Sequence, residues 1–277
     1  MKFPKGFIFL PLAWISVSSF ILSLFSGLIL SFHYFYTEPL ISVLKIENFV
    51  FMGKYWRELH YISSQIALIA LFLHLIDSVY KKFYFLKSKL TWLLLIFSLF
   101  LLLFITFTGY VIRQDETGEL AGAIAENILL SVPYIGRFLN KIFLSISEVG
   151  VGRVYNWHIF LSFGLALGLL FGHFKIKAVF RWSNFPYFLI ISLLPLILDF
   201  PLRAYQGLKA RGPWFFIGVQ EMLKFLPPVL VFFWLLLPFF LIFLYVIIPK
   251  KERLLHFFLI SYLMLYTLFS FLFLFKH

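Results

Sequence analysis

Long apolar runs separated by polar segments dominate the chain from end to end. Each run is long enough to cross a hydrocarbon core about 30 Å thick as a helix. The fifth run contains Pro195, which predicts a kinked or shortened helix. The pattern predicts an all-α membrane protein with about seven transmembrane helices, at residues 8–33, 56–79, 90–111, 154–174, 184–200, 228–249 and 254–275.

Two longer connections mix charged and apolar positions. The stretch 113–150 contains the run IAENILLSVPYI, and 203–227 joins the fifth and sixth runs. We expect both connections to form amphipathic surface helices on the membrane, one or two of them in the first stretch.

Composition excludes a soluble domain. The 277 residues are 62% hydrophobic and 13% charged, with a mean hydropathy of +0.96. The net charge of +12 is explained by basic residues that set the membrane topology and bind anionic lipid. We therefore expect a lipid membrane, and no nucleic acid, as partner. With no cysteine, the chain has no disulfide, iron–sulfur ligand or thioether-linked haem. The first run lacks a clear cleavage site and predicts a true span.

Basic residues favour one orientation. If the N-terminus is inside, the short inner segments hold 12 Lys and Arg against two acids, Asp77 and Glu252. The outer segments hold the other 12 basic residues but ten acids, spread over more chain. The positive-inside rule therefore predicts the N-terminus inside and the C-terminus outside.

Four histidines form two pairs within apolar runs. His60 and His74 are 14 residues apart, and His158 and His173 are 15 apart. In a helix, 14 residues are nearly four turns, so both imidazoles share a face about 21 Å apart. One such pair could equally be two interfacial histidines. Its recurrence favours haem, because neutral imidazole is a common axial ligand of haem iron.

The orientation predicts which histidines share a haem. His60 and His158 both come early in spans that run inward, whereas His74 and His173 come late. We expect the first two to hold an outer haem and the last two an inner haem. Arg57 and Arg153, before the outer pair, are candidate propionate partners, as are Lys81, Lys175 and Lys177 on the inner side. Asp77 is an unusual neighbour for a haem, and it is expected to pair with Lys81.

Several motifs, in order, resemble cytochrome b of the Rieske/cytochrome b complexes, in the arrangement of cytochrome b6 and subunit IV fused in one chain. The resemblance covers nearly the whole length. It implies a dihaem four-helix domain at 1–183 and a three-span domain at 184–277. The matching motifs are SGLILSFHY (26–34), Arg57-x-x-His60, KLTW (89–92), TGYV (108–111), NILLSVPYIG (127–136), Arg153-x-Tyr155-x-x-His158 and Trp214-Phe215-Phe216.

The resemblance implies two non-covalent b-type haems, an outer quinol-oxidising pocket and an inner quinone pocket. Electrons would cross the membrane through the haems of a quinol–cytochrome c oxidoreductase. A Rieske iron–sulfur protein, a c-type cytochrome and a homodimeric complex in a bacterial or archaeal-type cytoplasmic membrane are implied too. Gly27 and Gly109 match glycines that let a haem approach the backbone, although plain helix packing would also explain them.

The chain departs from the family at the outer pocket. The family's Pro-Glu-Trp-Tyr is replaced by Gly212-Pro213-Trp214-Phe215, so the usual glutamate is absent. Quinol oxidation still needs bases. Our candidates around Trp214 and Phe215 are Glu221, Glu116 and Glu126, with Asp115 beside them. For Glu221 the competing interpretation is a simple ion pair with Lys224. Two haem-facing glycines of the family are also replaced, by Ala13 and Leu95.

Two other functions stay open. The chain could be a dihaem quinone/quinol module of another redox complex, without bifurcating quinol oxidation, which the rewritten outer motifs favour. A channel or transporter with intramembrane histidines is the alternative from another class. Against it, no internal repeat of the kind common in transporters is found.

Overall fold

The computed structural model describes residues 11–85, 88–172, 181–203, 211–248 and 251–276. These residues form helices and their connections, with no strand among them, which confirms the predicted all-α class. The chain divides into two compact units. One contains residues 1–106 and 159–201, and the other contains residues 107–158 and 202–277.

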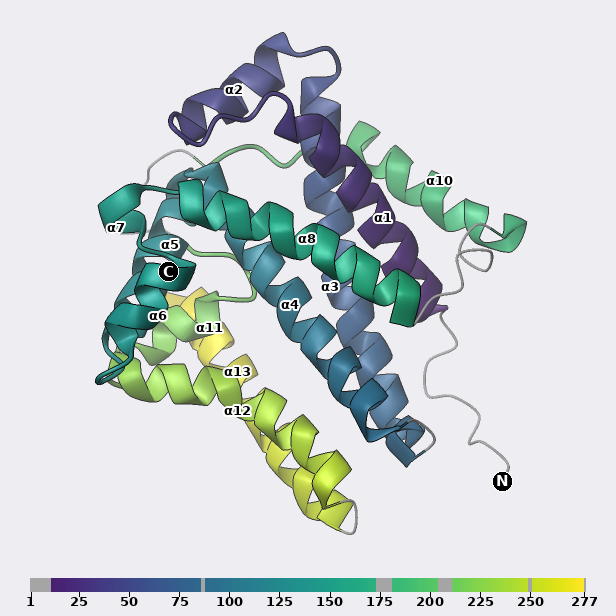
Figure 1. Ribbon diagram of the computed structural model, residues 1–277, viewed down its shortest axis with the longest axis vertical. Coiled ribbons are helices and arrows are strands. Elements are labelled where there is room, and N and C mark those ends of the chain that lie inside the picture. Colours follow the sequence, from purple (N-terminus) through teal and green to yellow (C-terminus); the bar gives the residue numbers. More distant parts are fainter. Residues whose placement is uncertain (1–10, 86–87, 173–180, 204–210, 249–250, 277) are drawn as a thin grey trace. The chain divides into compact units, whose positions relative to one another are not determined.

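The first unit is built on two long helices, α1 (Leu12–Ser31) and α3 (Gly53–Tyr80), which pack side by side (Figure 1). Small buried residues line the α3-facing side of α1, and Ser16 Oγ donates to the Ala67 carbonyl of α3 at 3.3 Å. Small side chains let helix backbones approach closely in a membrane protein. The unit also contains α2 (Pro39–Phe49), α10 (Phe185–Leu193), most of α4 (Lys89–Arg113) and the later part of α8 (Gly152–Gly172).

The second unit combines short helices with a long hairpin. The last turns of α4 lead into three of these helices, namely α5 (Glu116–Leu130), α6 (Gly136–Phe143) and α7 (Ile146–Val149). The C-terminal part forms α11 (Ile217–Met222), α12 (Pro228–Ile247) and α13 (Glu252–Lys276), and α13 packs against both of the others (Figure 1). A Cβ on Gly218 would lie 2.7 Å from Ser270 Oγ and from the Tyr266 ring, so this glycine allows α11 to reach α13.

Five described helices are long and apolar enough to cross a membrane, namely α1, α3, α4, α12 and α13. The fourth predicted span, 154–174, falls on α8, and its last two residues lie outside the described residues. The fifth predicted span, 184–200, is shortened at Pro195, as the sequence predicted. The helical segment ends at Leu196, because α10 tightens into a 3₁₀ turn, η3 (Leu194–Leu196), that contains Pro195.

The sequence patterns missed one helix and miscounted others. Helix α2 was not predicted, although Pro39 stands in its first turn, a position that proline favours. The connection 113–150 holds three helices where one or two were expected. In 203–227 the described residues form only the six-residue α11.

Candidate functional site

The His60 ring of α3 is held by α1. Its Nδ1 lies 2.8 Å from the backbone carbonyl oxygen of Ser23. A Cβ on Gly27, one turn further along α1, would lie 2.8 Å from Cε1 of the same ring. The carbonyl oxygen can only accept, so His60 donates from Nδ1. Ser23 and Gly27 together form a cradle for the imidazole.

The His158 ring of α8 is held in a matching way by α4. Its Nδ1 lies 3.0 Å from Oγ1 of Thr108. A Cβ on the next residue, Gly109, would lie 3.2 Å from Cε1 of the ring. His158 is only 8% exposed. In both units, therefore, an oxygen meets Nδ1 and a glycine meets Cε1.

The His60 cradle determines which ring nitrogen can bind a metal, and at His158 the Thr108 hydroxyl is able to accept the same Nδ1–H. In a neutral imidazole that donates from Nδ1, the lone pair is on Nε2. Metal-ligating histidines usually donate their other N–H in this way, which fixes the tautomer and the ring orientation. Among the described residues, no three His, Asp or Glu side chains gather to hold a bare metal ion. Each imidazole can instead bring one bond to a metal-containing cofactor.

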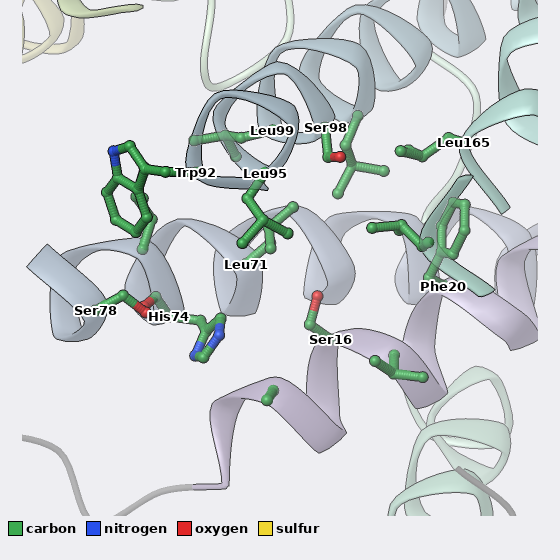
Figure 2. A pocket seen from close by; sticks show the side chains of 15 residues that line it. Ser16, Phe20, Leu71, His74, Ser78, Trp92, Leu95, Ser98, Leu99 and Leu165 are labelled. Carbon is green, nitrogen blue, oxygen red and sulfur yellow. The ribbon is translucent and has the colours of Figure 1, made fainter. Parts of the chain in front are cut away.

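The His74 ring lies in the wall of an apolar pocket in the first unit. Figure 2 shows His74 and Ser78 of α3 together with Trp92 and Leu99 of α4, with Ser16 of α1 close by. Its predicted partner His173 lies outside the described residues, as do Lys175 and Lys177. The remaining lining residues are Ala13, Val17, Phe20, Leu71, Leu75, Leu95, Ser98, Leu102, Leu165 and Leu169.

Two pocket residues are the ones that replace family glycines. Ala13 and Leu95 both line the cavity beside His74, and Leu95 is labelled above Leu71 in Figure 2. The two replacements predicted from the sequence therefore fall on one cavity, to whose wall they bring side chains. Beside it, Lys81 forms the expected pair with Asp77, at 2.5 Å.

Arg57 is occupied by protein groups. Its Nε lies 3.3 Å from Oε2 of Glu47, and its Nη2 lies 3.2 Å from Oε1 of Glu58. Nη2 also donates to the carbonyl oxygen of Phe200 at 2.9 Å. The side chain is 7% exposed. Arg57 thus ties α2, α3 and the segment after η3 together, one turn before His60.

Arg153 is the second predicted propionate partner. Its Nη1 is buried and has no hydrogen-bond partner among the described residues. A buried guanidinium nitrogen without an acceptor is costly. The Nε of Arg57 is likewise buried without a hydrogen bond, but it lies 3.3 Å from a carboxylate oxygen of Glu47, so Arg153 is the stronger candidate to bind a propionate.

Glu126 belongs to a hydrogen-bond network between short helices. Its Oε1 accepts from Asn140 Nδ2 at 2.9 Å and from Ser147 Oγ at 3.0 Å. Its Oε2 accepts from the Ser147 backbone N–H at 3.0 Å. These bonds join α5, α6 and α7, so the geometry is that of a structural carboxylate.

Glu221 is fully buried in α11, and its Oε2 lies 2.5 Å from Nζ of Lys224. This is the ion pair of the competing interpretation. Lys224 also sits 5.5 Å from the centroid of the Phe273 ring on α13. The pair therefore contributes to the contact between α11 and α13.

Aromatic residues surround the segment that replaces Pro-Glu-Trp-Tyr. The Phe215 ring meets Trp214 at 5.4 Å and Tyr110 at 5.8 Å between centroids. Its carbonyl oxygen accepts from the Tyr266 hydroxyl. Glu116 is buried in the first turn of α5. Trp214, Phe215 and Glu116 all belong to the second unit.

Asp115 caps α5 and cannot easily act as a base. Its Oδ1 accepts from the Gly118 N–H at 3.1 Å. Its Oδ2 lies 2.7 Å from Arg113 Nη2 and accepts from the Arg203 N–H at 3.1 Å. Such a cap satisfies a backbone donor at the helix start.

Sequence patterns did not single out Ser23 or Thr108. Serine and threonine are ordinary in membrane helices, so composition carried no signal. Spacing did carry one, since Ser23 stands one turn before Gly27 and Thr108 directly before Gly109. A hydroxyl residue beside a glycine that faces a histidine would have been the feature to seek.

The fold and these sites define a multi-pass helical membrane protein with imidazoles prepared for a metal-containing cofactor. The family model described as Cytochrome b(N-terminal)/b6/petB matches residues 65–183. Cytochrome b6 of Euglena gracilis is 30% identical over 177 residues, which are 62% of this chain and 82% of that protein. Cytochrome b6 of Heliobacterium modesticaldum is 27% identical over 172 residues, 60% and 81% of the two chains.

A solved structure described as Hyperthermophilic respiratory Complex III has the same fold. The TM-score is 0.67 at 16% identity, over 97% of this chain and 85% of that one. Together with the sequence similarity, this shows that the chain belongs to the cytochrome b family.

Proposed function

We propose that the chain is the dihaem cytochrome b subunit of a quinol–cytochrome c oxidoreductase and passes electrons from quinol across the membrane. His60 and His158 would hold one b-type haem, and His74 and His173 the other. The observation that carries the proposal is the matched cradle, in which an oxygen engages Nδ1 and a glycine faces Cε1 at both His60 and His158. A haem supplies one-electron redox chemistry when bound.

The residues of the chain fit that cofactor. The Nδ1 bonds orient the two imidazoles and leave Nε2 for iron. The glycines keep space beside each ring that a Cβ would fill. Arg153 has a buried donor for a carboxylate, and the lining of the His74 pocket is mostly apolar, which suits the hydrophobic faces of a haem.

The wider assignment rests on the family and on the basic residues. The complex would include a Rieske iron–sulfur protein and a c-type cytochrome, would be a homodimer, and would lie in a bacterial or archaeal-type cytoplasmic membrane. The N-terminus would be inside and the C-terminus outside. Residues 1–183 would form the haem-binding domain and 184–277 the subunit IV-like domain.

The test is haem quantification and a redox titration of the protein purified in mild detergent. We expect two b-type haems per chain with separate midpoints. H60A and H158A should each remove the same haem, and H74A and H173A the other, whereas H256A should remove neither. A folded protein without haem, under conditions that load a control cytochrome, would overturn the proposal.

A second candidate keeps the two haems but omits bifurcated quinol oxidation. It is favoured by the outer acids, because Glu126 accepts three hydrogen bonds and Glu221 is buried in an ion pair. In this case quinol would reduce the haems without an oxidised iron–sulfur partner. Stopped-flow reduction with and without that partner, with the inner pathway blocked by H74A, distinguishes the two candidates.

A further inference from the structure

The two histidine cradles differ in the chemical nature of the oxygen nearest to Nδ1. At His60 it is a backbone carbonyl of α1, 2.8 Å away, with the Ser23 and Ser26 hydroxyls farther off at 3.4 and 3.5 Å. At His158 it is the Thr108 hydroxyl of α4, 3.0 Å away. Both Thr108 and His158 are buried, so bulk water cannot replace a lost bond at this depth.

A threonine hydroxyl in a helix commonly donates its own hydrogen to the carbonyl four residues earlier. Its lone pairs then remain as acceptors, which suits a neighbouring N–H. The ring of His158 is fixed in a second direction by Gly109, because a Cβ there would stand 3.2 Å from Cε1. Two adjacent residues of α4, Thr108 and Gly109, therefore control both the tautomer and the position of the imidazole.

We propose that Thr108 is a positioning residue for the haem ligand His158: its hydroxyl accepts the Nδ1–H and thereby sets both the retention and the reduction potential of that haem. This inference rests on the proposed function. A hydrogen bond from Nδ1 makes the ligand more basic and stabilises the ferric iron. Loss of the bond should therefore raise the midpoint potential of that one haem.

The matched variants are T108V, T108S and T106V, all on α4. Valine keeps the shape of threonine and removes the hydroxyl, and serine restores it. Thr106 is also buried, but its hydroxyl bonds to the Leu102 carbonyl at 2.8 Å, so T106V controls for loss of a buried hydroxyl from this helix. The whole purified protein is used, with haem per chain, midpoint titration and the low-spin EPR spectrum as readouts.

We expect T108V to raise the midpoint of the haem that H158A removes, to weaken its retention about 10–100-fold, or to do both. The other haem should be unchanged, and T108S and T106V should match the parent. If T108V leaves midpoint, retention and EPR spectrum unaltered, the inference is overturned. It is overturned as well if T108S changes the midpoint or the haem retention as much as T108V does. Absence of haem from the parent would instead contradict the proposed function.

Discussion

Gly27 lies so close to His60 that a Cβ at position 27 would be 2.8 Å from Cε1 of the ring. Real Cβ atoms do not approach other heavy atoms so closely, so any larger residue must displace the imidazole or separate α1 from α3. The ring cannot easily move, because its Nδ1 is held by Ser23. Gly27 thus leaves the imidazole in its orientation, which fixes the direction in which Nε2 points.

G27A should therefore reduce haem content. The added methyl group overpacks the site at a cost of about 1–3 kcal/mol, which opposes the gain of about 1 kcal/mol in helix propensity. G109A should have a smaller effect in the same direction, since its Cβ would be 3.2 Å from the His158 ring. Haem per chain, measured against protein mass, gives the comparison.

The control for these variants is G164A. No heavy atom lies within 4 Å of a Cβ built on Gly164, so this change tests helix propensity alone. Equal haem content in G27A and G164A would show that the cradle tolerates a methyl group.

R153Q should loosen one haem without unfolding the protein. The buried Nη1 of Arg153 lacks an acceptor among the described residues, so the substitution removes a donor prepared for a carboxylate of the cofactor. We expect a lower haem occupancy and a shifted midpoint, with the helix content by circular dichroism unchanged. If R153Q has the haem occupancy and the midpoint potentials of the parent, Arg153 does not bind the cofactor.

R57L should act on stability instead. It leaves Glu47 and Glu58 without the buried cation that they contact, and breaking such a pair costs about 3–5 kcal/mol. Thermal unfolding in detergent should shift strongly downward, even for protein prepared without haem. K54A is the control, because Lys54 pairs with Asp199 at an exposed site, where solvent screens the pair and its loss should change stability little.

E126A should destabilise the second unit and leave the haem chemistry intact. It removes the acceptor of three hydrogen bonds from Asn140 and Ser147, and unsatisfied buried donors cost about 1–3 kcal/mol each. E119A, at an exposed position of the same helix, serves for comparison. Quinol-driven haem reduction that fails while the melting temperature stays normal would assign Glu126 a catalytic role.

The long helices could be predicted because nothing competes with their apolar runs. Helices α1, α3, α4, α12 and α13 appear close to the expected bounds. In the fifth run the effect of Pro195 could be predicted as a kink or a shortening, but hydropathy alone did not show that the helical segment ends in a 3₁₀ turn at Leu196. Helix α2 was missed since its apolar positions are interrupted by Glu47, Lys45 and Asn48.

The site was predictable in its residue types and not in its contacts. Histidine spacing and the glycines pointed to His60, His158, Gly27 and Gly109, and the structure brings each glycine to a histidine ring. Whether an arginine or glutamate is already engaged depends on residues distant in the chain, as Phe200 is from Arg57. Such pairings leave no periodic signal.

The short helical segment around α10, the fifth predicted span, makes the fit of this protein to its membrane depend on membrane thickness. From Trp182 to Leu196 the helical segment, of which six residues are 3₁₀ helix, rises about 25 Å, roughly 5 Å less than an average hydrocarbon core of ~30 Å. Its exposed residues, such as Ile190 and Leu196, are apolar, as expected of side chains that face lipid. In a membrane that this segment spans, the lipids beside α10 would have to compress or tilt, at a fraction of a kcal/mol per Å. Acyl-chain length would then act on the anchor of Arg57, because the same segment continues to Phe200.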